Sequence, residues 1–206
     1  MRPRPVAALW MGSAFGAALA VAAGVLVVAG TGEKGIDAAL RATARLSFLL
    51  FWVAYAGSAM ASLFGSPFQT LKLRAREFGL AFASAQLVHI GLVVWLCLIG
   101  AAPDVSTFVF FGIALVWVYL LALFSIGRLR RALGPGSWWI LRTIGLNYIA
   151  YAFIVDLLRN PLHGGVGHVV EYLPFATLAI AGPVLRLAAF VQRLGPAWRQ
   201  FPYRTG

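Results

Sequence analysis

Charged residues are scarce in this chain, and acidic residues are the scarcest of all. Only 11% of the 206 residues are charged, with 6 Asp and Glu beside 17 Lys and Arg. An ordinary soluble domain has about 25% charged residues, and so few charges could not cover the surface of a soluble fold. Hydrophobic residues make up 61% of the chain, and the mean hydropathy is +0.85. The composition therefore predicts an integral membrane protein in contact with lipid.

Cysteine is nearly absent as well. The single cysteine, Cys97, lies in an apolar run, so the chain cannot form an internal disulfide or a multi-cysteine metal site. We interpret Cys97 as a core-filling residue. The sequence also lacks a P-loop, a dinucleotide-binding fingerprint, a nucleophile elbow and an HExxH motif. It therefore offers no basis for soluble-enzyme chemistry and no catalytic residue.

The excess of basic residues gives a net charge of +11. These residues fall between apolar runs and not on one polar face, so they indicate membrane topology and not a nucleic-acid partner. With both termini inside, the inner segments hold 13 Lys and Arg and the outer segments hold 4. The pattern predicts an all-α bundle of six transmembrane helices, N-in and C-in, forming a single domain over residues 1–206. The expected spans are residues 6–30, 45–64, 79–100, 107–126, 140–158 and 172–191.

Small residues predict where two of these spans pack. Gly12, Gly16, Ala20 and Gly24 recur at every fourth position of the first span, a spacing that lets another helix approach closely. The second span carries a similar small face around Gly57. We expect the Ser-Pro pair at residues 66–67 to end that helix.

His89 is the most informative residue, because it interrupts an apolar run of the third span. At about 1.5 Å per residue, it lies roughly 15 Å along a helix begun at Gly79, near the middle of a hydrocarbon core about 30 Å thick. An ionisable group at that depth is costly and indicates function. His89 could ligate a metal or haem, relay protons, or hydrogen-bond a neighbour. Gln86 lies one turn earlier on the same face, so a polar pair of Gln86 and His89 inside the bundle is an alternative interpretation.

Other polar residues have simpler interpretations. Asp156 lies three residues before Arg159, which suggests an ion pair at the outer interface. Arg186 could extend to the inner surface or hold a carboxylate or propionate of a cofactor. His163 and His168 belong to a Gly-rich segment, residues 159–171, that we expect to be an outer loop. Their spacing matches no named metal motif.

Part of the chain resembles the ferric reductase-like transmembrane domain family, and within it the haem-binding membrane subunit of the bacterial methionine sulfoxide reductase system. The resemblance rests on residues 42–46 (ATARL), the short turn at 65–67 (GSP), and 74–82 (RAREFGLAF) followed by His89. It implies a bacterial-type inner membrane protein, an oxidoreductase subunit that carries electrons through b-type haem held by paired histidines. It also implies a flavin or quinol donor and a soluble or periplasmic redox partner. On this pattern His89 corresponds to the haem ligand of the third span.

The sequence departs from the family where further haem ligands are expected. Asn147 and Asn160 stand where the family's fifth span carries histidines, and Ala102 and Pro103 stand where a second histidine of the third span would fall. Two stacked haems are therefore not expected. A single haem on His89 would take its second ligand from His163 or His168, from a partner, or would remain five-coordinate.

Two further hypotheses stay open at this stage. A relative without haem could act as a membrane scaffold or partner subunit, as the asparagines at 147 and 160 suggest. A small transporter or proton relay could use His89, Gln86 and Asp156, although the spans lack the paired broken helices that are typical of many carriers.

Overall fold

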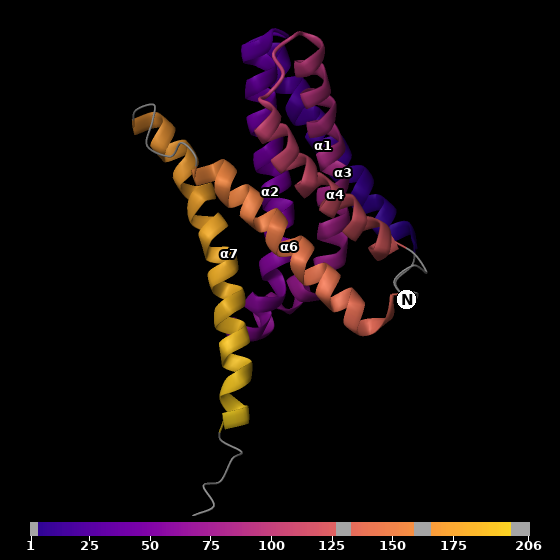
Figure 1. Cartoon of the computed structure of the whole chain (residues 1–206), viewed down its shortest axis with the longest axis vertical. Coiled ribbons are helices and arrows are strands. Elements are labelled where there is room, and N and C mark those ends of the chain that lie inside the picture. Colours follow the sequence, from indigo (N-terminus) through magenta and orange to yellow (C-terminus); the bar gives the residue numbers. More distant parts are fainter. Residues whose placement is uncertain (1–3, 127–132, 159–165, 199–206) are drawn as a thin grey trace, which may run out of the picture.

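The computed structural model describes residues 4–126, 133–158 and 166–198, and the regular structure within them is helical. Its six long helices each contain a stretch long and apolar enough to cross a membrane, which confirms the predicted all-α, six-helix architecture (Figure 1). They are α1 (Arg4–Ala29), α2 (Glu33–Phe64), α3 (Gln69–Leu98), α4 (Val105–Ile126), α6 (Gly134–Leu158) and α7 (Val166–Trp198), with a 3-10 turn, η1 (Ser66–Phe68), between α2 and α3.

Several helices extend beyond the apolar spans. The helix α2 begins at Glu33, and an acidic residue in a first turn is stabilised by the positive end of the helix dipole. The predicted break at residues 66–67 is confirmed, because Gly65 takes a positive φ of 81° and the proline opens η1.

The helix α7 begins at Val166, so the backbone of His168 lies in its first turn. The prediction that His168 belongs to a loop is therefore wrong.

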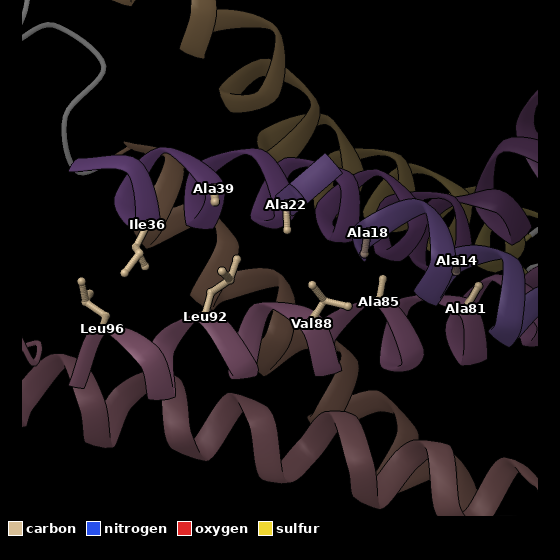
Figure 2. Close-up of a cluster of buried hydrophobic side chains, with 10 residues drawn as sticks. All are labelled: Ala14, Ala18, Ala22, Ile36, Ala39, Ala81, Ala85, Val88, Leu92 and Leu96. Atoms are coloured by element: carbon tan, nitrogen blue, oxygen red, sulfur yellow. The ribbon is translucent and has the colours of Figure 1, made fainter. Parts of the chain in front are cut away.

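A tightly packed core joins α1, α2 and α3. Ala14, Ala18 and Ala22 of α1 are buried against α3, where Ala81 and Ala85 face them (Figure 2). The predicted glycine stripe does not form this contact, because a Cβ added at Gly12, Gly16 or Gly24 would meet nothing within 4 Å. The stripe that packs has the same four-residue spacing but is displaced by two residues. Two residues rotate the helix by more than half a turn, so the glycines point away from this core.

The remaining helices pack around aromatic and small residues. Phe51 of α2 contacts Phe82 of α3 and Phe153 of α6, with ring centroids 5.4 Å apart in both pairs. At Gly145 of α6 an added Cβ would lie 2.7 Å from Cε3 of Trp117 in α4, so only glycine allows this close approach. Figure 1 shows α6 running obliquely to α2 and α3.

The helix α7 packs along α2 through polar contacts distributed over most of its length. Arg45 donates to Glu171 at 2.5 Å, and Trp52 Nε1 donates to the Leu178 carbonyl at 2.7 Å. Further along, Arg193 donates to Ser62 Oγ at 3.0 Å. These contacts hold α7 on the far side of α2 from α1.

Candidate ligand cavity beside His89

His89 and Thr43 meet at the same depth of the bundle. His89 lies roughly 14 Å from the C-terminal end of α3, and Thr43 lies roughly 15 Å from the N-terminal end of α2, at about 1.5 Å per residue. These two helix ends lie at the same face of the bundle, because α2 and α3 are antiparallel neighbours joined by η1. His89 therefore lies at the same height of the bundle as Thr43, roughly 14 Å from this face.

The hydrogen bonds of Thr43 orient the imidazole ring. Thr43 Oγ1 donates to the Ala39 carbonyl at 2.9 Å, with the Leu40 carbonyl at 3.1 Å, and it lies 3.1 Å from Nδ1 of His89. A hydroxyl has one proton. If that proton is used on the backbone, Oγ1 accepts from Nδ1–H, and the neutral ring keeps its lone pair on Nε2. Metal-ligating histidines usually have such a second hydrogen bond, which sets the tautomer and the ring orientation.

A cavity of about 600 Å³ opens beside this ring. Its volume falls within the roughly 300–1,000 Å³ typical of small-molecule and cofactor sites. Its walls come from four helices and are mostly apolar, with His89 and Gln86 as polar groups in the central part and Asp37, Arg41 and Asp156 near the helix ends. The apolar lining includes Phe82, Ile90, Val93, Phe108, Phe111, Leu115, Val118, Ile149 and Phe153.

Gln86 contributes a polar atom without a partner to this region. Its Oε1 is buried and forms no hydrogen bond with the described residues, so the predicted pairing of Gln86 with His89 is not made through this oxygen. A buried acceptor left unpaired costs about 1–3 kcal/mol. Such a cost is typical of a site in which a ligand completes the hydrogen bonding.

The other predicted site residues lie elsewhere. The Arg186 guanidinium stacks over the Tyr55 ring, 4.3 Å from its centroid, and Tyr55 donates to Asn147 Oδ1 at 2.8 Å. These three residues connect α7, α2 and α6, and none of them is among the lining residues of the His89 cavity. His163 and the side chain of His168 lie outside the described residues, as does Asn160.

Sequence reasoning did not single out the role of Thr43 or the cavity. Thr43 lies four residues after Ala39, so its hydroxyl is expected to bond the Ala39 carbonyl of its own helix. Its contact with His89 could not be predicted from the sequence of α2 alone. The cavity is formed by residues from α2, α3, α4 and α6. Its shape depends on helix packing angles, which have no local signal in the sequence.

The donor set suits a ligand bound through one imidazole. Within the described residues no cluster of three or more His, Cys, Asp or Glu could hold a metal ion, and the described lining contains His89 as its one histidine. A haem would thus find one axial ligand, with Nδ1 fixed by Thr43, and apolar walls. The paired histidines that the family resemblance implies are not provided by the described part of the chain.

Comparisons with known proteins found no matching family model, no similar curated protein and no similar solved structure.

Proposed function

We propose that this chain is a ferric-reductase-like membrane subunit that holds a single b-type haem in the His89 cavity and takes part in electron transfer across the membrane. The observation that supports this proposal most directly is the His89 imidazole. It contacts Thr43 Oγ1 at 3.1 Å and lines a mostly apolar cavity of about 600 Å³.

The described residues would divide the work of holding the cofactor. His89 Nε2 would bind the haem iron, and Thr43 would keep the ring in the required tautomer. The aromatic and aliphatic walls would exclude water, which with the axial ligand sets the reduction potential of a haem. When bound, the haem would supply one-electron transfer, between a flavin or quinol donor and a redox partner.

The proposal includes an orientation with both termini in the cytoplasm of a bacterial-type plasma membrane. It is supported by the charge distribution along the chain. The outer segments hold five of the six acidic residues, and the inner segments hold 13 of the 17 basic ones. Basic residues are retained on the cytoplasmic side during insertion.

An absorbance spectrum of the purified full-length protein, expressed with ample haem, tests this proposal. We expect a Soret band in the wild type and its loss in His89→Ala, since no other described lining residue offers an imidazole. Val93→Ala is the matched control: Val93 lies one turn from His89 in the same cavity but offers no ligand atom, so this variant should retain the band. A wild-type protein without a Soret band would refute the haem assignment.

The coordination number can be read from the same spectra. If His89 alone holds the haem iron, His163→Ala and His168→Ala should leave the spectrum unchanged. A change from a low-spin to a high-spin spectrum in one of these variants would identify the second axial ligand.

A haem-free membrane scaffold is the second candidate, and a specific contact favours it. Asn147, at the position where the family resemblance calls for a histidine, is engaged by Tyr55 at 2.8 Å. A scaffold predicts that His89→Ala leaves folding and capture of a partner subunit intact, with no bound chromophore in either protein. The spectrum therefore separates the two candidates.

A further inference from the structure

A second cavity, of about 280 Å³, lies between α2, α3, α4 and α6. Three basic side chains line it: Lys72 and Arg76 from the start of α3, and Arg142 from α6. Its described lining contains no acidic residue. Phe82, Val118 and Ile149 line both this cavity and the His89 cavity, so the two lie on either side of one apolar partition. The proposed haem site makes no use of the basic cavity.

The three cations reach the cavity from two helices. Lys72 and Arg76 are one turn apart and share a face of α3, and Arg142 approaches from α6. Arg76 is held in place by two bonds to the Ser125 carbonyl, from Nε at 3.0 Å and from Nη2 at 2.7 Å. These bonds satisfy a carbonyl near the C-terminus of α4 but use only two of the five guanidinium N–H donors.

Charge at this cavity is one-sided. Like charges around a small space repel one another, although solvent partly screens these three exposed side chains. Glu77 follows Arg76 in sequence, but it is only 4% exposed and is not among the described lining residues. An anion inside the cavity would offset the repulsion. Phosphate fits the donor set well, because arginine can bind its oxygens in pairs while lysine adds a point charge.

The rest of the lining indicates what is attached to the phosphate. Phe51, Phe82 and Leu121 give the cavity an apolar side next to its basic side, and Trp138 lies at its edge. Basic pockets between transmembrane helices are known to bind the head groups of anionic lipids. We propose that this cavity binds a phosphate group, with Lys72, Arg76 and Arg142 as ligands, and that an anionic phospholipid supplies it. A soluble phosphate ester would use the same chemistry, and the test below separates the two sources.

The test measures the thermal stability of the full-length protein in detergent with added phosphatidylglycerol, phosphatidylcholine or inorganic phosphate. We expect phosphatidylglycerol to raise Tm by several degrees over phosphatidylcholine, because a ligand that binds only the folded state stabilises it. Lys72→Gln and Arg142→Gln should each remove most of this difference, and Arg142→Lys should restore part of it. Arg76 is left intact because it also bonds Ser125.

Arg74→Gln is the matched control. Arg74 belongs to the same helix and to the same basic cluster, but it stacks over Trp10 at 5.7 Å and does not line the cavity. It should retain the full lipid effect. Protection by inorganic phosphate at millimolar concentration, lost in Arg142→Gln, would support the same site with a soluble phosphate ester as ligand. Equal losses in Arg74→Gln and Arg142→Gln, or no selective stabilisation by an anionic ligand, would overturn the proposal. Lys72 is exposed, so Lys72→Gln keeps the test valid if Arg142→Gln fails to fold.

Discussion

The role of a polar side chain in an apolar helix depends on whether it has a partner on another helix. Thr43 has no exposed surface and bonds its own helix through the Ala39 carbonyl, as many helical threonines do. Its contact with His89 Nδ1 at 3.1 Å gives it a second role, because this contact orients the imidazole ring. Asn147 and Gln86 differ in the same respect. Asn147 accepts a hydrogen bond from Tyr55, whereas Gln86 Oε1 has no partner within the described residues.

Thr43→Val should destabilise the protein by about 0.5–1.5 kcal/mol, because it removes the hydroxyl that lies 3.1 Å from Nδ1 of His89. At about 2–4 °C per kcal/mol for a chain of this size, the loss is measurable as a lower Tm in detergent. Thr43→Ser keeps the hydroxyl and should restore most of the stability.

Thr177→Val provides the control for this change. Thr177 Oγ1 donates to the Leu173 carbonyl of its own helix at 2.8 Å, on an exposed face. Its loss should have little effect. If Thr43→Val were as mild as Thr177→Val, the contact between Thr43 and His89 would have no energetic weight.

At the scale of the helix, the spacing of small residues does not by itself predict which face packs against a neighbouring helix. Both four-residue stripes of α1 permit close approach, and the alanine stripe is the one that faces α3 (Figure 2). Alanine methyls interlock with Ala81, Ala85 and Val88, whereas the glycines leave open space. Each alanine also favours the helical state over glycine by about 1 kcal/mol.

Ala18→Leu and Gly16→Leu compare the two stripes directly. Ala18 is fully buried against α3, so the larger side chain should cost about 1–3 kcal/mol through overpacking. Gly16 has nothing within 4 Å of an added Cβ, so its substitution should be tolerated. Thermal unfolding of both variants in the same detergent checks this, and an equal loss of stability would contradict the packing seen for α1.

At the scale of the whole molecule, the charged residues that the structure describes differ between the two ends of the bundle. They are mixed in sign at the end where α2 begins and nearly all basic at the end where α3 begins. Arg41 pairs with Asp37, and Arg45 pairs with Glu171. At the opposite end Lys72, Arg76 and Arg142 converge on one cavity. This asymmetry is the basis of both the proposed orientation and the proposed phosphate site.

Cysteine labelling in intact cells tests the orientation. In a Cys97→Ser background, Ala102→Cys in the α3–α4 connection should react with a membrane-impermeant maleimide added outside. Ser66→Cys, in η1 at the other end, should react only after lysis. Both positions are exposed. The reverse labelling pattern would show that the basic end faces outward and would remove the support for the N-in orientation.

The sequence by itself determined the helical class of this protein and the presence of its six long apolar helices. Six apolar runs, their separation by basic segments and the break at residues 66–67 are local properties, so they could be predicted, and the structure bears out the helices and the break. The position of His89 within a long apolar helix also follows from the sequence alone, whereas its contact with Thr43 does not.

Only the tertiary structure decided which residues meet. The pairing of His89 with Thr43, the diversion of Asn147 to Tyr55, and the two cavities on either side of Phe82 and Val118 depend on the rotation and crossing of four helices. In α1, α3, α4 and α6 the apolar residues are spread around most of the helix and not gathered on one face. Hydrophobic periodicity therefore carries little information about which face turns inward, and the contacts had to be read from the packed bundle.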